Sequence, residues 1–222
     1  RDRNSDDTYR PERANPEKKK IIIFSPHPDD DVISMGGTFQ RLVDHGHDVH
    51  IVYQTSGNIA VSNDSVLKFL EVYSDIFKVD DDLIDRTKNK LLDNNEIIND
   101  KFIREVATKI REKESLAATR YVGLNDQNVH FLRLPFYESG KIVKNKTSKS
   151  DLDLMNQIII KIKPHQIYAA GDLADPHGTH SVCIKLLFQS LNKLKREKFM
   201  NNCWVWLYSC LLYTSDAADD KQ

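Results

Sequence analysis

The sequence lacks long hydrophobic runs, paired cysteines and an excess of charge of either sign. Its apolar runs are only a few residues long, whereas a membrane-spanning helix needs about 20. The 32 Lys+Arg residues nearly balance the 33 Asp+Glu residues, and the formal net charge is -1. These features argue against a membrane span and against a nucleic-acid binder that works through a bulk basic field.

The three cysteines, Cys183, Cys203 and Cys210, are odd in number and form no C-x-x-C pair. This usage argues against a disulfide scaffold and a thiolate zinc site, and it suits a reducing compartment. Because no secretory leader is visible, the expected location is the cytoplasm.

The chain of 222 residues is long enough for one domain with a sizeable core and additional tails. Residues 1–19 are polar and charged, so they bury too little apolar surface to offset the cost of ordering them. We interpret 1–19 as a linker that follows a missing N-terminal domain, and 20–209 as the folded domain. Residues 210–222 are interpreted as a foreign or disordered tail, because LLYTSDAADD at 211–220 resembles a translated adaptor sequence.

Short β-branched runs alternate along the chain with segments of helical apolar spacing. This alternation predicts an α/β layered domain with a mostly parallel sheet. Strands are expected at 20–24, 48–53, 129–135, 166–171 and 204–208. Helices are expected at 32–45, 64–119 with an acidic break at 80–82, 152–159 and 179–198.

Two loops that follow predicted strands are rich in side chains that bind metals. They are segment 26–31, P-H-P-D-D-D, and segment 175–180, D-P-H-G-T-H. The carboxyl ends of adjacent parallel strands would bring the two loops together. Two imidazoles and a carboxylate suit a borderline metal such as zinc and leave a position open for water. His27 and Asp30 can reach one ion from a single turn, and Asp29 could take a proton in metal-assisted hydrolysis.

Each loop alone has a simpler interpretation. A run of aspartates is often a solvated turn or the charged start of a helix, and an H-x-x-H pair is often incidental. Their joint occurrence after strand ends in one α/β domain favours a functional site. A nicotinamide site is disfavoured, because Met35-Gly36-Gly37 does not match G-x-G-x-x-G.

Segment 26–31, followed by M-G-G-T at 35–38, resembles the (A/S)-H-P-D-D-E…G-G-T signature of the PIG-L/LmbE-like zinc-dependent N-deacetylases. The resemblance covers about 20–209 and includes R-x-x-E at 111–114 and H-x-x-H at 177–180. It implies a Rossmann-like three-layer sandwich and one zinc ion per chain. The implied reaction removes acetyl from an N-acetylated amino sugar or its conjugate.

The resemblance also implies roles for individual residues. His27, Asp30 and His180 would bind zinc. Asp29 would be the general base, and His177 would stabilise the oxyanion and protonate the leaving amine.

Arg111 would contact the substrate, although a surface ion pair with Glu114 is an equal alternative. Asp31, which replaces the usual Glu, would support the ligands from behind. Thr179 stands where the family often has Asp, so Asp175 or Asp172 would orient His177. The aromatic pair at 136–137 replaces a segment that is acidic in the family, and Phe136 suits either a sugar contact or the core.

The segments leading into the domain and following its second strand look closest to one subgroup of this family. In that subgroup the deacetylase-like domain is fused behind a glucosamine-6-phosphate deaminase-like domain, so a fused partner is expected. Two other functions stay open: a non-catalytic sugar-binding or regulatory module of such a fusion, and a magnesium-dependent phosphatase. The two imidazoles speak against the phosphatase, and metal analysis would separate the three.

Overall fold

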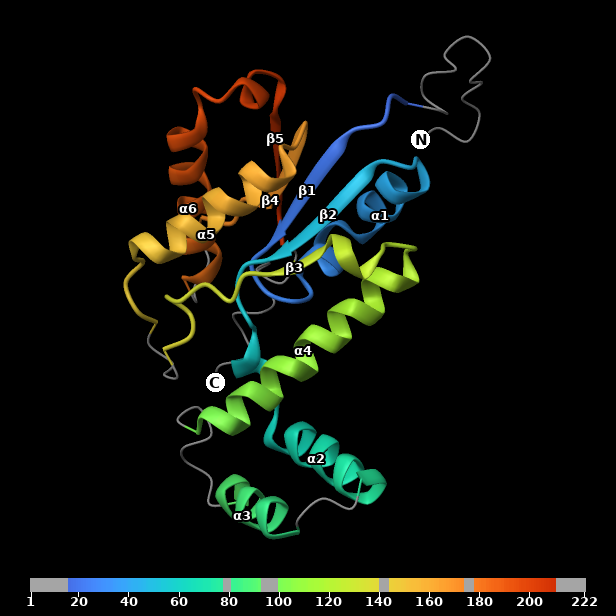
Figure 1. The fold of residues 1–222 in the computed structure, drawn as a ribbon, viewed down its shortest axis with the longest axis vertical. Helices are drawn as coiled ribbons and strands as arrows, with labels where there is room; N and C mark the ends of the chain where they lie inside the picture. Colours follow the sequence, from blue (N-terminus) through green and yellow to red (C-terminus); the bar gives the residue numbers. More distant parts are fainter. Residues whose placement is uncertain (1–15, 78–80, 93–99, 140–143, 174–177, 211–222) are drawn as a thin grey trace, which may run out of the picture.

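The computed structural model describes residues 16–77, 81–92, 100–139, 144–173 and 178–210. Within them, five parallel strands form one sheet in the order β3-β2-β1-β4-β5 (Figure 1). The strands are β1 Lys20–Ser25, β2 Asp48–Tyr53, β3 Val129–Phe131, β4 Gln166–Ala170 and β5 Trp204–Tyr208. This topology confirms the expected α/β class.

Helices cover both faces of the sheet and complete the three layers that the resemblance implies (Figure 1). Helix α1 packs on one face, and α5 and α6 pack on the other. Helices α2 and α3 lie away from the sheet, beyond α4. The described helices are α1 Asp30–Asp44, α2 Asn63–Phe77, α3 Asp81–Leu92, α4 Lys101–Tyr121, α5 Lys149–Ile162 and α6 Thr179–Leu194, with 3₁₀ turns η2 Asn58–Ala60, η4 Asp126–Asn128 and η5 Lys198–Asn202.

The apolar run of β1 fixes the centre of the sheet. Successive side chains of a strand point to opposite faces, so Ile21 and Ile23 pack toward α1, whereas Ile22 and Phe24 pack toward α5 and α6. All four side chains are fully buried, as expected for a parallel strand covered on both sides. The polar segment that follows Ser25 therefore starts at the middle of the sheet's carboxyl edge.

The segment expected to be helical over 64–119 contains three helices, α2, α3 and α4. Helix α3 begins beside the expected acidic break, but the separate start of α4 was not expected. Its physical cause is Asp100, whose carboxylate accepts hydrogen bonds from the backbone N–H groups of Phe102 and Ile103 and so caps a new helix. The apolar faces of the three helices form a small core of their own.

Strand β3 is shorter than expected, although the chain continues beside β2. The N–H groups of Leu132 and Leu134 donate to carbonyls at the end of β2, each at 2.9 Å. Between them, Arg133 has a left-handed backbone with a φ of 47°, which interrupts the strand. Its guanidinium pairs with Glu105 and Glu112, at 3.0 and 2.6 Å, and so joins this segment to α4.

In the described part of the chain, we find no helix that is both long enough and apolar enough to cross a bilayer. The expected linker and tail lie largely outside the described residues. Cys210, which the sequence analysis placed at the start of the tail, is described and buried.

A buried carboxylate holds the loop between β3 and α5. Asp151 is fully buried and accepts hydrogen bonds from the backbone N–H groups of Phe136 and Ser148, at 2.9 and 2.8 Å. The hydroxyl of Ser148 donates to the same side chain at 2.7 Å. These bonds fix the start of α5 against Phe136, which is buried in the core rather than free to contact a sugar.

Replacing Asp151 with alanine should lower the free energy of unfolding by about 2–3 kcal/mol, because buried N–H donors lose their acceptor. Urea denaturation followed by circular dichroism measures the change. Asp153→Ala on the same helix is the matched control. Asp153 is partly exposed and pairs with Lys193 at 3.5 Å, so its loss should cost less than about 0.5 kcal/mol. Equal costs for the two variants would contradict the anchoring role of Asp151.

Candidate active site

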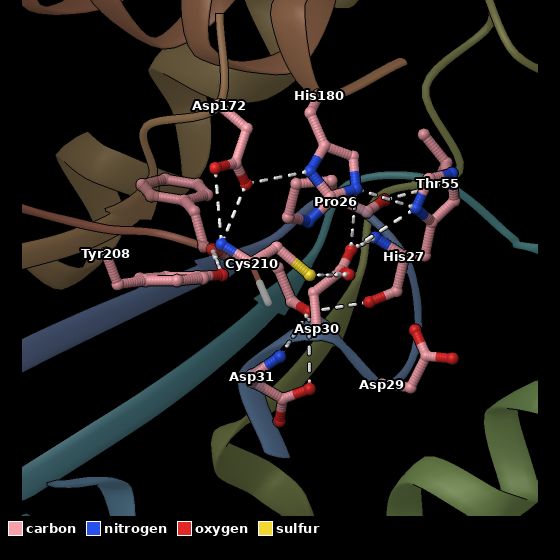
Figure 2. Close-up of polar contacts among 12 residues, drawn as sticks. Pro26, His27, Asp29, Asp30, Asp31, Thr55, Asp172, His180, Tyr208 and Cys210 are labelled. Carbon is pink, nitrogen blue, oxygen red and sulfur yellow. Dashed lines mark hydrogen bonds and ion pairs between the residues drawn. The ribbon is translucent and has the colours of Figure 1, made fainter. Parts of the chain in front are cut away.

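Three side chains that could ligate a metal meet where the carboxyl ends of β1 and β4 lie side by side (Figure 2). His27 follows β1, Asp30 starts α1, and His180 lies in the first turn of α6. His27 Nδ1, Asp30 Oδ2 and His180 Nε2 are separated by 3.2 Å in every pair. The structure thus brings together the three residues that the sequence analysis named as metal ligands.

The spacing of these three atoms fits a single tetrahedral ion. Zinc with bonds of 2.0–2.1 Å would hold its ligand atoms about 3.3–3.4 Å apart. Two imidazoles and one carboxylate are a donor set of catalytic zinc sites, and they leave a fourth position open. Magnesium prefers oxygen ligands, so the imidazoles argue against it.

A second carboxylate, Asp172, orients His180 from behind (Figure 2). Its Oδ2 lies 3.3 Å from His180 Nδ1. A proton on Nδ1, donated to Asp172, leaves the lone pair of Nε2 directed at the cluster. Asp172 also accepts a hydrogen bond from the backbone N–H of Cys210 at 3.0 Å. The sequence analysis considered Asp172 only as a partner of His177, so its contact with His180 is new.

Two of the three side chains are buried, and His27 is partly exposed. Asp30 is 2% exposed and His180 is 1% exposed. Burial alone would raise the pKa of Asp30, but hydrogen bonds and positive charge from His180 and His27 outweigh it and hold that pKa well below its usual range. A buried anionic oxygen facing two imidazole nitrogens is a site that attracts a cation.

Asp31 lies behind the cluster and supports the turn that carries Asp30. The hydroxyls of Ser25 and Tyr53 donate to its carboxylate at 3.2 and 3.0 Å, and its own N–H donates to the Ser25 hydroxyl. Burial raises the pKa of Asp31 to about 6 despite these donors. The shorter side chain that replaces the family's Glu is therefore fully accommodated in the interior.

Asp29 lies beside the cluster, and no drawn contact joins its carboxylate to the cluster (Figure 2). Arg111 of α4 donates from Nη2 to Asp29 Oδ2 at 2.7 Å and from Nη1 to Glu114 at 3.4 Å. Arg111 therefore makes the helix ion pair with Glu114 and also binds Asp29, whereas its contact with substrate stays a prediction. These residues line one side of a cavity of about 190 Å³. A carboxylate that adjoins the cluster without entering it is placed to take a proton from a nearby water.

The loop after β2 contacts the turn that follows β1 and carries His27 and Asp29. Gly57 has a φ of +60°, and a Cβ there would lie 2.7 Å from Pro28 Cδ and 3.5 Å from Arg111 Nε. The hydroxyl of Thr55 donates to the Pro26 carbonyl at 2.7 Å. Any side chain at Gly57 would therefore strain the backbone and displace Pro28.

Two of the expected site residues, His177 and Asp175, lie outside the described residues. One neighbour that the sequence analysis did not assign to the site is Tyr137, whose buried ring meets the ring of His27 edge-on, with centroids 5.9 Å apart. The only sequence signal for this contact is the aromatic pair at 136–137, which departs from the family pattern.

Comparisons with known proteins agree with this geometry. A family model described as PIG-L: GlcNAc-PI de-N-acetylase matches residues 22–191. A glucosamine-6-phosphate deaminase-like protein of Bacteroides thetaiotaomicron is 46% identical over 216 residues. The alignment covers 92% of this chain and 33% of that protein, so the chain spans about a third of its relative's length.

Two solved structures show the same fold. The N,N'-diacetylchitobiose deacetylase of Pyrococcus horikoshii, in complex with an inhibitor, has a TM-score of 0.55 and 20% identity over 89% of this chain and 61% of its own. The 4-carboxy-2-hydroxymuconate hydratase GalB of Pseudomonas putida has a TM-score of 0.53 and 17% identity, over 81% of this chain and 59% of its own. At these identities the likeness establishes the fold alone.

Replacing Asp172 with alanine should weaken zinc binding about 10- to 100-fold, because His180 loses the acceptor that fixes its ring and tautomer. Competition against a chromogenic chelator measures the affinity. Asp172→Asn keeps an oxygen acceptor and should lose less, and Asp153→Ala, remote on α5, is the control. Unchanged affinity in Asp172→Ala would remove the orienting role.

Proposed function

This chain belongs to the PIG-L family, and from that premise we propose that it is a zinc-dependent deacetylase acting on an N-acetylated amino sugar or its conjugate. The observation that carries the proposal is the cluster of His27, Asp30 and His180, with ligand atoms 3.2 Å apart and Asp29 beside it. The description of the matching family, a de-N-acetylase, supports the same activity.

In this proposal His27, Asp30 and His180 hold the ion. A bound zinc ion supplies a Lewis acid that polarises the acetamide carbonyl and lowers the pKa of a water. Asp29 takes the proton of the attacking water, and His177 supplies a proton to the leaving nitrogen, as the family resemblance implies. Arg111 holds Asp29 Oδ2 at 2.7 Å, which keeps the carboxylate aligned beside the cluster.

His177 completes the proposed mechanism. By the family resemblance, its imidazolium donates to the oxygen that becomes negative in the tetrahedral intermediate. A donor directed at such an oxyanion contributes about 3–4 kcal/mol to catalysis in comparable sites.

The alternative is a non-catalytic sugar-binding or regulatory module. A module without chemistry has no need to hold two imidazoles and a carboxylate in tetrahedral spacing, or to place Asp172 against one of them. The arrangement therefore favours the enzyme.

We also propose that this domain belongs to a longer protein that includes a glucosamine-6-phosphate deaminase-like part. The support is the Bacteroides relative, whose name is deaminase-like and of which this chain matches a third. Deacetylation frees an amino group, so the two activities would act in sequence on one sugar.

The purified chain, loaded with zinc, should release acetate from N-acetylglucosamine or one of its conjugates. Asp29→Asn should keep about one zinc per chain and lose at least about 100-fold in turnover, the usual contribution of a positioned base. His180→Ala should lose the metal together with the activity.

Elemental analysis and an acetate assay on both variants test these roles. Lys149→Ala, on the exposed start of α5, is the control and should behave as the unaltered chain. Full turnover by zinc-loaded Asp29→Asn would exclude Asp29 as the base, and full zinc content in His180→Ala would move the third ligand elsewhere. A chain that binds no metal and releases no acetate would favour the non-catalytic module.

His177→Ala should remove most activity, by about 100- to 1,000-fold, while zinc stays bound. The donor must be protonated during turnover and Asp29 must be ionised, so the rate should fall on both sides of a pH optimum. The alkaline limb should flatten in His177→Ala. If the rate of His177→Ala still fell fully at high pH, that loss of rate would belong to another group.

A further inference from the structure

Lys144 and Tyr137 lie next to the cluster, and the proposed reaction uses neither of them. The Nζ of Lys144 lies 4.0 Å from the ring centroid of Tyr137. The Tyr137 ring in turn meets His27 edge-on at 5.9 Å between centroids. The ammonium group therefore lies within about 10 Å of the His27 ring, by simple addition of these contacts.

The electrostatic setting of this pair extends to the proposed base. Burial raises the pKa of Tyr137, and the charges of Glu138, Arg111 and Asp29 also act on its hydroxyl. The Tyr137 ring thus contacts both the ammonium group of Lys144 and the ring of His27. The ring forms a common wall for the cluster and for the ammonium group.

Lys144 itself is partly withdrawn from water. Burial lowers its pKa, and the exposed Glu138 works in the opposite direction. Within the described residues, no carboxylate lies at ion-pair distance from its Nζ, in contrast to Arg111, which holds Asp29 and Glu114. An ammonium on an aromatic face, partly dehydrated and without a close counter-ion, is a site for an anion.

We propose that Lys144, held on the face of Tyr137, recognises an anionic substituent of the N-acetylated substrate. The inference rests on the proposed function, because it takes the acetamide to lie at the cluster. The ammonium group lies no more than about 10 Å from the His27 ring, so a substituent within about seven bonds of about 1.5 Å from the amide can reach it. Phosphate and carboxylate groups share the required chemistry, and a point charge such as Lys suits either.

The test compares four substrates with the zinc-loaded chain: N-acetylglucosamine, its 6-phosphate, its 1-phosphate, and the acid in which C6 is a carboxylate. At least one anionic substrate should exceed the neutral sugar in kcat/KM by about tenfold or more at low ionic strength, and salt should reduce this preference. The substrate that gains identifies both the anion and its position.

Lys144→Met keeps the length of the side chain and should reduce the anionic-to-neutral ratio of kcat/KM about tenfold, chiefly through KM. Lys144→Arg should restore most of the ratio, which a purely structural role would not predict. Lys146→Met is the matched control, because Lys146 is exposed two positions along the same loop. It should leave the ratio unchanged.

Equal kcat/KM for the neutral and all anionic substrates would overturn this inference and leave the deacetylase proposal intact. An unaltered anionic-to-neutral ratio of kcat/KM in Lys144→Met would also overturn this inference. Absence of acetate release from every substrate would instead refute the proposed function, and this inference with it.

Discussion

The pairing of β1 with β4 is the constraint on which the rest of the structure depends. It brings His27 and His180, which are 153 positions apart in the chain, to a nitrogen–nitrogen distance of 3.2 Å. A shift of one residue would exchange the side chains of Ile21 to Phe24 between the two core clusters that they fill, so the packing of these clusters favours the observed register. The geometry of the cluster is therefore set by the core and not by the loops that carry it.

The charges of the site divide into an inner and an outer group. Asp30 and Asp172 surround His180 in the interior, where a carboxylate without a counter-charge costs several kcal/mol. Outside them, Arg111 compensates Asp29. A divalent cation held by the cluster would compensate the inner pair. A bound metal ion would therefore stabilise the turn after β1, in addition to its role in the proposed reaction.

Sequence patterns predicted the features that depend on short segments of the chain, namely the strands and the loops that carry the metal ligands. The apolar runs located the strands, and the ligand-rich loops followed from the rule that carboxyl ends of parallel strands meet. Contacts across the fold were not predictable, because they depend on where a distant element crosses: the hydroxyl of Tyr53 on Asp31, and the ring of Tyr137 on His27. The prediction of a continuous helix was wrong at Asp100, because this residue caps a new helix inside a segment that otherwise has helical apolar spacing.

The shared fold of a deacetylase and a hydratase shows that this sheet can serve more than one chemistry, so specificity must lie in the side chains around it. In this chain those side chains come from elements outside the central pairing. Arg111 belongs to α4, and Tyr137 and Lys144 to the segment before α5. They can change without loss of the β1–β4 register, whereas His27 cannot move independently of it. Substrate selection can thus diverge while the metal-binding geometry is retained.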